Sequence, residues 1–263
     1  MPALRRTATI VAAYLFVLFV HGLALASGEK REACAFGAPL ADVVHQLQRA
    51  GNPWVTWFQR VNVEVVIAIL AGALVAGLIL HPARQLAFRR FLCFHGVIFS
   101  IRMVVIWVTT IPSPNPLCRG RLMTAGTTER AVTLTLDAVG IPRQWFGLHA
   151  TGPTCCDIVL SGHAAMLVVE AAILLMLFES RVMRWLTLAV TTIGLLATIG
   201  PDRHYTVEVL LTLTLGALLV AWYRRVAESG DAGLVRWIEQ PGAFAHALRP
   251  MSWHELRLRG DGR

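Results

Sequence analysis

Six apolar runs divide this sequence, and their lengths limit the fold more than any other feature does. A membrane-crossing helix needs about 20 mainly apolar residues. Hydrophobic residues make up 56% of the chain and charged ones 15%, which is too apolar for an ordinary soluble domain. We therefore predict an all-α, polytopic membrane protein, a bundle of six transmembrane helices. The predicted spans are 10–26, 63–80, 91–111, 158–178, 182–199 and 204–223, followed by a polar tail, 226–263.

The first run has a second interpretation. Ala24, Leu25 and Ala26 resemble the small-residue cleavage site of a signal peptide. The run of about 17 residues is long for a signal peptide and short for a span. We favour a helix that is retained, and either interpretation leaves the following segment outside.

Arginines set the predicted orientation in the membrane. Cytoplasmic links carry an excess of Lys and Arg, and here arginines recur at alternate ends of the spans. This pattern places both termini and the polar tail in the cytoplasm. We read the net charge of +8 as this topology signal plus attraction to anionic lipid headgroups, and not as nucleic-acid binding. The arginines concerned are Arg5, Arg6, Arg84, Arg89, Arg90, Arg181, Arg184, Arg224 and Arg225.

Two histidines, His163 and His204, lie 41 residues apart, which leaves room for two spans and a tight turn. A chain that crosses a bilayer and returns comes back to the same face. Both histidines are therefore expected at the outer, periplasmic or lumenal, ends of neighbouring spans. Glu208 follows His204 by four residues, a spacing that puts the two side chains on one face of a helix.

Two imidazoles and a carboxylate at a membrane surface suit phosphoryl transfer. An imidazole can attack phosphorus and hold the group as a phosphohistidine, a role we assign to His204. Glu208 would fix the tautomer of His204, and His163 would protonate the leaving oxygen and then deprotonate the incoming one. Ser161 and Gly162 bring a hydroxyl and a close backbone approach at a helix start, which favours anions. No metal-binding motif is present, and we expect neither metal nor cofactor.

Arg102 lies inside the third predicted span, where an arginine is costly and usually faces a cavity or a partner. We expect its guanidinium to meet a donor phosphate as a bidentate fork. The alternative is an arginine used in helix packing or directed at the inner interface.

Three ordered segments resemble the sphingomyelin synthase family, within the wider lipid phosphate phosphatase, or PAP2-like, superfamily. CCDIVLSGHAAML is similar to the family's C-G-D-x-x-x-S-G-H-T, and RHYTVEV to its H-Y-T-x-D-V. RRFLCFHGVIFSIRMVVIWVTTIPSPNPLC resembles its R-R-F, V-T-T-x-P-x-P and C pattern. APLADVVHQL faintly resembles its P-P-L-P-D stretch. The resemblance covers roughly residues 38–225 and implies six spans with an outward-facing site.

The resemblance also implies roles for particular residues. The family's catalytic triad falls on His163, His204 and Glu208, and Glu208 replaces an aspartate. Ala164 stands where the family has threonine, and Arg203 where a member often has an acidic residue. Within the matching motifs, the residues we expect to bind substrate or phosphate are Ser161, Asp157, Arg102, Arg203 and Tyr205.

What the resemblance implies is a lipid phosphotransferase. It would move a phospho-headgroup such as phosphocholine or phosphoethanolamine from a glycerophospholipid to ceramide or a related lipid alcohol, releasing diacylglycerol. The alternative is a PAP2-type lipid phosphate phosphatase or a phospholipase C-like hydrolase that uses the same triad with water as the acceptor. Because these lipids stay in the bilayer, we expect the site to open sideways onto an apolar chamber. The oligomeric state stays open, with a homo-oligomer as one alternative.

Cysteines on the predicted outer side include Cys34, Cys118, Cys155 and Cys156. Cys118 and one of Cys155 or Cys156 match cysteines of the resembling family. We expect a disulfide between them, because an outer compartment permits disulfides. Free buried thiols are the alternative.

Overall fold

The computed structural model describes most of the chain, and every regular element within the described ranges is helical. Asp157, Arg203 and the four outer cysteines lie outside these ranges, so the predictions made for them stay predictions. The described residues are 2–31, 36, 40–81, 84–109, 111–114, 126–139, 141, 143–148, 159–200, 204–229 and 233–239.

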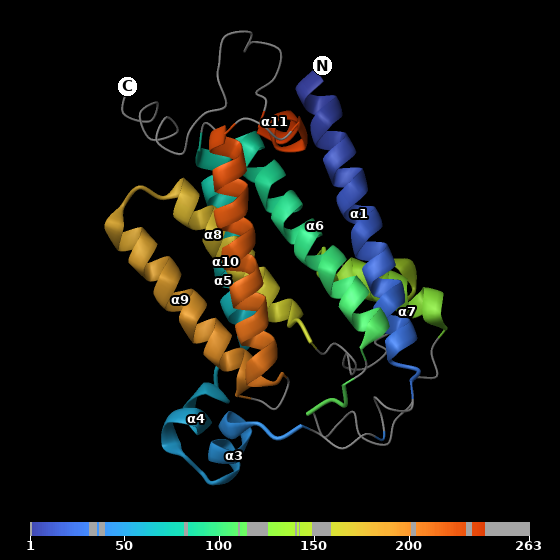
Figure 1. Cartoon of the computed structure of the whole chain (residues 1–263), viewed down its shortest axis with the longest axis vertical. Helices are drawn as coiled ribbons and strands as arrows, with labels where there is room; N and C mark the ends of the chain where they lie inside the picture. The colour runs from blue at the N-terminus through green and yellow to red at the C-terminus, as the bar shows by residue number, and fades with distance from the viewer. Residues whose placement is uncertain are drawn as a thin grey trace.

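Six long helices run roughly along one axis, and shorter ones gather near the two ends (Figure 1). The long helices are α1 (Pro2–Gly28), α5 (Val63–Leu80), α6 (Arg84–Val108), α8 (Gly162–Leu177), α9 (Arg181–Ile199) and α10 (Thr206–Ser229). The short elements are α3 (Val43–Arg49), α4 (Pro53–Phe58), α7 (Thr127–Ala138), the 3-10 turn η2 (Arg143–Phe146) and α11 (Gly233–Glu239).

Five of the long helices, α1, α5, α6, α9 and α10, are long and apolar enough to cross a membrane, which supports a multi-pass membrane protein. The fourth predicted span, 158–178, contains the shorter helix α8 of 16 residues. At 1.5 Å per residue α8 is about 24 Å long, less than the roughly 30 Å of a bilayer's hydrocarbon core. The count of six crossing helices therefore stays a prediction.

Two helix boundaries differ from the sequence-based expectation in ways that matter for the site. α6 begins at Arg84 and not at residue 91, because Leu86 and Ala87 already bury an apolar face. α10 begins at Thr206, so His204 precedes the helix that it was expected to open.

α8 is the centre of the bundle. It packs against α5, α6, α9 and α10, and its side chains Leu167, Ile173 and Leu174 are fully buried. α1 packs along α6 and α7, where the Glu29 carboxylate receives two 2.9 Å hydrogen bonds from the buried Arg130 guanidinium. The N-terminal ends of α8 and α10 lie at one end of the bundle, near α3 and α4 (Figure 1). The two histidines therefore share one end.

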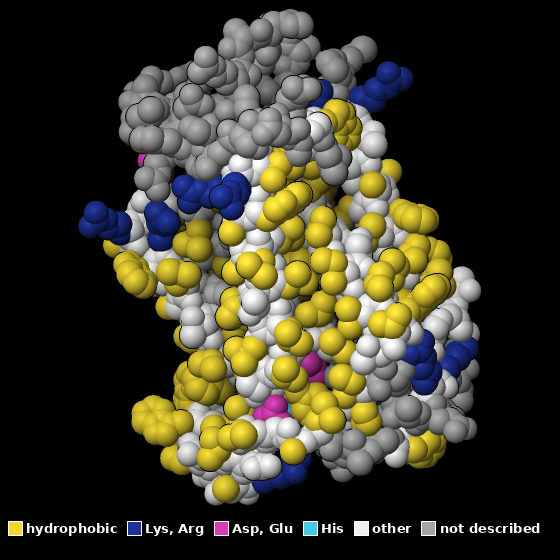
Figure 2. Space-filling view, in the orientation of Figure 1, with side chains coloured by type: hydrophobic (Ala, Val, Ile, Leu, Met, Phe, Trp, Pro, Cys, Tyr) yellow, Lys and Arg dark blue, Asp and Glu magenta, His cyan; other side chains and the backbone are white. Residues whose placement is uncertain are grey.

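The distribution of surface side chains also distinguishes the two ends of the bundle. In Figure 2, hydrophobic side chains cover the middle of the molecule. One group of Lys and Arg side chains lies toward the end where α9 begins, and others lie at the lower right and at the bottom of the view. Two patches of acidic side chains interrupt the apolar surface toward the opposite end. We call the end that carries Arg181, Arg184, Arg224 and Arg225 the arginine-rich end, and the opposite end, where α8 and α10 begin, the histidine end.

Asp42, far from α10 in sequence, caps the N-terminus of α10. Its carboxylate accepts hydrogen bonds from the backbone N–H of Thr206, at 2.7 Å, and from the Thr206 hydroxyl, at 3.0 Å. It also caps α3 by accepting from the backbone N–H of Val44 at 2.9 Å. Burial alone raises the pKa of the Asp42 carboxyl, but the hydrogen bonds from Thr206 and the His45 backbone outweigh burial and lower that pKa below its ordinary value.

We predict that Gly22→Ala loosens the contact between α1 and α7. A Cβ at Gly22 would lie 2.8 Å from the backbone oxygen of Ala131, which cannot move without moving α7. Overpacking of this kind costs about 1–3 kcal/mol, measurable as the free energy of unfolding in detergent micelles. Gly72→Ala is the matched control, because a Cβ there meets nothing within 4 Å. Equal stability of the two variants would contradict the close approach.

We predict that Asp42→Ala destabilises the protein by about 0.5–2 kcal/mol, the usual cost of losing a helix cap. Because the pKa of Asp42 is lower in the folded protein, its ionised form contributes stability above the unfolded pKa, near 3.8, and that contribution is lost as pH falls through the folded pKa. The stability difference between wild type and variant should therefore be constant near neutral pH and shrink below about pH 4. Asp42→Asn, which keeps one acceptor oxygen, should lose less. A stability difference between wild type and Asp42→Ala that persists unchanged in acid would show that the charge of Asp42 does not stabilise the fold.

Candidate active site

His163 is positioned by the start of α8. Ser161 is the N-cap, and its hydroxyl oxygen accepts a hydrogen bond from the backbone N–H of Ala164 at 3.2 Å. Ser161 is fully buried, so its side chain stabilises the helix start where the imidazole emerges. A phosphate-binding role for Ser161 would add to this cap.

Glu208 holds His204 and, at the same time, the start of α10. One carboxylate oxygen lies 2.7 Å from Nδ1 of His204, and the other accepts a hydrogen bond of 3.1 Å from the backbone N–H of Tyr205. Glu208 is the third residue of α10, and its side chain accepts a hydrogen bond from the backbone N–H of the residue that precedes the helix. This contact is half of a capping box. The contact with His204 thus forms although His204 is not helical, because the chain turns at Tyr205.

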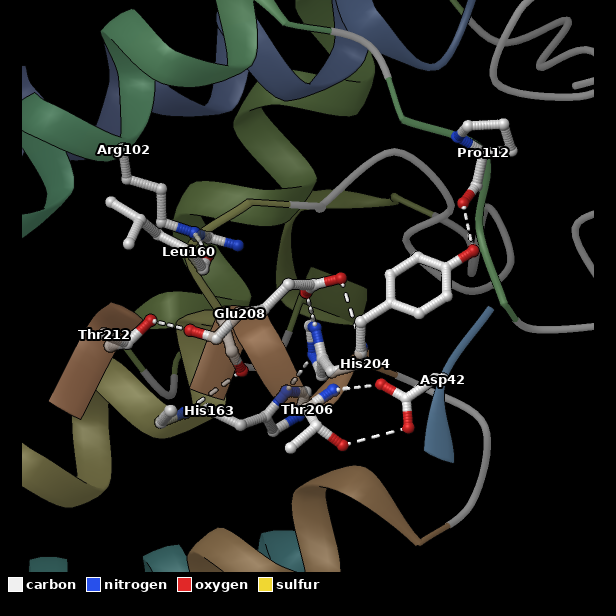
Figure 3. Close-up of polar contacts among 12 residues, drawn as sticks. Asp42, Arg102, Pro112, Leu160, His163, His204, Thr206, Glu208 and Thr212 are labelled. Atoms are coloured by element: carbon white, nitrogen blue, oxygen red, sulfur yellow. Dashed lines mark hydrogen bonds and ion pairs between the residues drawn. The ribbon is translucent and has the colours of Figure 1, made fainter. Parts of the chain in front are cut away.

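The two imidazoles face each other. Nδ1 of His163 lies 3.3 Å from Nε2 of His204, and Figure 3 shows the His204 ring between Glu208 and His163. The other nitrogen of His163, Nε2, lies 2.8 Å from a carboxylate oxygen of Glu64 at the start of α5. The site is therefore a row of four groups in the order Glu208, His204, His163 and Glu64.

If both carboxylates are ionised, the row determines where the protons lie. An ionised carboxylate only accepts hydrogen bonds, so Nδ1 of His204 and Nε2 of His163 must each carry a proton. The two inner nitrogens would then both be bare, and a hydrogen bond between them needs one further proton. With both carboxylates ionised, the pair of imidazoles holds three protons and a charge of +1. One ring can then act as an acid while the other is a nucleophile.

The two carboxylates differ in exposure. The side chains of His204 and Glu208 are 5% and 1% exposed, whereas those of His163 and Glu64 are 26% and 62% exposed. Water screens an exposed pair far more than a buried one, so the Glu208 contact is the stronger of the two.

Arg102 reaches this end of the bundle from the last third of α6. Its Nε donates to the backbone oxygen of Leu160 at 2.6 Å, and Nη1 donates to Nε2 of His21 on α1 at 2.7 Å. A Cβ at Gly162 would lie 3.0 Å from Nη2, so a glycine beside His163 leaves room for the guanidinium. Figure 3 shows the guanidinium extending toward Glu208. Arg102 thus lies beside the histidine pair, with two of its nitrogens already held.

Tyr205 has both hydrogen-bonding roles of its hydroxyl occupied. The hydroxyl accepts from the backbone N–H of Leu40 and donates to the backbone oxygen of Pro112, each at 2.9 Å. The ring is buried, and His45 next to it donates from Nε2 to the backbone oxygen of His204 at 3.1 Å. Tyr205 was expected to bind substrate. In the structure it connects the segments that contain Leu40 and Pro112 to the turn that carries His204.

Sequence reasoning missed three partners of the predicted residues: Glu64, His21 and His45. Each belongs to a helix remote in sequence, and no local spacing connects it to the histidines. Asp42 lay within the faint P-P-L-P-D resemblance, which was the one signal for its position. Among the described residues, no three His, Cys, Asp or Glu side chains are grouped as a metal site requires.

Both helices that carry the site point their N-termini at it. The N-terminus of a helix carries a partial positive charge and favours anions. α8 begins one residue before His163, and α10 begins two residues after His204. With Arg102 beside them, the two helix starts make this end favourable for a phosphate.

An apolar cavity of about 890 Å³ lies elsewhere, between α8, α9 and α10. None of His163, His204 and Glu208 lines it. It extends from Val168 and Leu213 to Arg224 and Arg225, toward the arginine-rich end. The chamber expected to open directly onto the histidines is thus not the cavity described here.

Comparison with known proteins connects this site to lipid chemistry. Residues 154–225, which include both histidines and Glu208, match the family described as PAP2 superfamily C-terminal. Phosphatidylcholine:ceramide cholinephosphotransferase 1 of Homo sapiens is 26% identical over 216 residues, which cover 77% of this chain and 50% of the human protein. The protein of the same name from Caenorhabditis elegans is 26% identical over 215 residues, 78% of this chain and 43% of that protein.

The chain spans about half the length of the curated relatives that it matches. The match nevertheless extends well beyond the histidine motifs, as the resemblance in the sequence predicted. Residues 154–225 are therefore similar to the PAP2 superfamily C-terminal family, and the chain around them is similar to the phosphatidylcholine:ceramide cholinephosphotransferases.

Proposed function

We propose that this protein transfers a phosphorylated headgroup from a glycerophospholipid to ceramide or a related lipid alcohol and releases diacylglycerol. The row Glu208, His204, His163 and Glu64 carries the proposal, because it supplies a nucleophile and an acid–base group in contact. The relatives named as ceramide cholinephosphotransferases support the donor and acceptor classes.

In the first half-reaction, Nε2 of His204 attacks the donor phosphorus. The N–P bond forms as the bond from phosphorus to the glycerol oxygen breaks, and His163 gives that oxygen its extra proton. Diacylglycerol leaves, and the headgroup phosphate stays on His204. Glu208, hydrogen-bonded to Nδ1, stabilises the positive charge that develops on the His204 ring.

In the second half-reaction, the roles of acid and base reverse. The primary hydroxyl of ceramide gives its proton to His163, and its oxygen attacks the phosphorus. The N–P bond breaks, which returns His204 to its starting state, and the product is the phosphorylated ceramide. The proton count of the histidine pair is the same at the end as at the beginning.

The phosphate lies, in this proposal, between the two helix starts and Arg102. Two nitrogens of Arg102 are held by Leu160 and His21, so the guanidinium is fixed before substrate arrives. A fixed positive charge stabilises the phosphoryl transition state without reorganising. Ser161, Asp157 and Arg203 are further proposed contacts to the headgroup. Tyr205, whose hydroxyl is already occupied by Leu40 and Pro112, is proposed to hold the turn beside His204.

The proposed orientation follows from the positive-inside rule. The arginine-rich end and both termini would face the cytoplasm, and the histidine end would face the periplasm or lumen. On this side the headgroups of the outer leaflet are level with His163 and His204.

We predict that His204→Ala abolishes transfer and any trapped phosphoenzyme. The test incubates protein in vesicles with headgroup-labelled phosphatidylcholine, then adds ceramide. An acid-labile, alkali-stable label on wild type identifies a phosphohistidine. His163→Ala should still load slowly from a donor with a good leaving group, because the nucleophile remains.

The same experiment separates the transferase from a hydrolase. Label appearing in a ceramide product supports transfer, whereas labelled phosphocholine released only to water would show a phospholipase C-like hydrolysis. Retention of transfer by well-folded His204→Ala protein would refute the assignment of the nucleophile.

We predict that the two carboxylates differ in effect according to their burial. Glu208→Gln keeps the shape but removes a buried charge, and kcat should fall by orders of magnitude, up to about 10⁴-fold as in the analogous protease change. Glu64→Gln removes a largely exposed charge and should lower kcat about tenfold or less, because water screens it. Glu208→Asp, which restores the family's residue, should keep measurable activity. Equal losses in the two glutamine variants would show that burial does not set their contributions.

A further inference from the structure

The apolar cavity between α8, α9 and α10 lies outside the proposed reaction. α9 and α10 lie close together near the histidine end and diverge toward the other end (Figure 1). The wedge between them holds the cavity of about 890 Å³, within the roughly 300–1,000 Å³ of typical ligand pockets. Its size and its place among membrane helices suit a lipid.

The walls of the cavity are apolar and built partly from small residues. Leucine and valine side chains line it together with alanine and glycine, so its inner part offers alkyl contacts and few hydrogen bonds. Such a surface fits acyl chains. The small residues are Ala171, Ala172, Gly216, Ala217 and Ala221.

The mouth of the cavity is basic. Among the described residues, it is lined by Arg184 at the start of α9 and by Arg224 and Arg225 near the end of α10, together with one acidic residue, Glu179. His81 lines it too, and burial lowers the pKa of this histidine, so it adds no charge at neutral pH. Figure 2 shows Lys and Arg side chains gathered at the same end. The excess of positive charge fits an anionic headgroup, and a zwitterionic one would gain less.

We propose that this cleft binds one anionic glycerophospholipid, with its phosphate among Arg184, Arg224 and Arg225 and its acyl chains along the small residues of α8 and α10. The bound lipid belongs to the leaflet at the arginine-rich end, opposite the histidines. It is therefore separate from the donor lipid of the proposed reaction, and its binding does not rest on that reaction.

Native mass spectrometry of delipidated protein titrated with dioleoylphosphatidylglycerol tests the proposal. Ala217→Trp fills the cleft, and the double variant Arg224→Gln, Arg225→Gln removes charge from its mouth. Each should weaken binding of the tightest phosphatidylglycerol by about tenfold or more. The matched controls are Leu218→Trp, next to Ala217 but outside the cleft, and Arg181→Gln, an exposed arginine that does not line it. Both controls should bind as wild type does.

Two further arms decide the site and the headgroup. His204→Ala should bind phosphatidylglycerol unchanged, because the catalytic end is not involved, and dioleoylphosphatidylcholine should compete poorly. The proposal is overturned if the cleft variants bind like wild type, if His204→Ala alone loses the lipid, or if phosphatidylcholine competes equally. Protein that appears only as a dimer, and is monomeric as Ala217→Trp, would show that a second copy covers the cleft.

Discussion

A buried carboxylate, that of Glu208, is the interaction on which the site depends. A carboxylate inside an apolar bundle is costly unless its oxygens are paired. Here one oxygen contacts the His204 ring, and the other accepts from the backbone N–H of Tyr205. The same carboxylate thus caps the helix and orients His204, the proposed nucleophile. A shift of α10 would move the imidazole with it, so the helix start sets the geometry of the chemistry.

Irregular backbone next to membrane helices has to be satisfied by the protein itself. The segment before α10 meets this demand through Asp42, His45 and Tyr205, which hold the backbone and side chains of the turn. Leu160, before α8, gives its carbonyl oxygen to Arg102. The arginine therefore satisfies backbone and brings positive charge to the same place, which explains why so costly a residue lies within α6.

Among the described residues, the sequence was enough to find five helices that can cross a membrane, because apolar runs of this length have few alternatives. It also brought Glu208 to His204, since four residues reach one turn even where the first residue precedes the helix. It could not show that Glu64 meets His163 or that His21 meets Arg102, because those contacts depend on how α5 and α1 pack. Nor could it show that α9 and α10 diverge toward the arginine-rich end, because the distance between two helices depends on the volumes of the side chains that pack between them. Asp157, Arg203 and the outer cysteines lie outside the described residues, so their predicted roles rest on the resemblance.

α8 joins the two ends of the molecule. Its first turn carries His163, and its later turns form a wall of the cleft at the arginine-rich end. It is the shortest of the long helices, and it is surrounded by α5, α6, α9 and α10. Gly216 lets α10 approach Val168 so closely that an added Cβ would collide with that side chain. Because α8 and α10 carry the two histidine segments and also enclose the cleft, whatever fills the cleft packs against the same two helices that set the distance between the imidazoles.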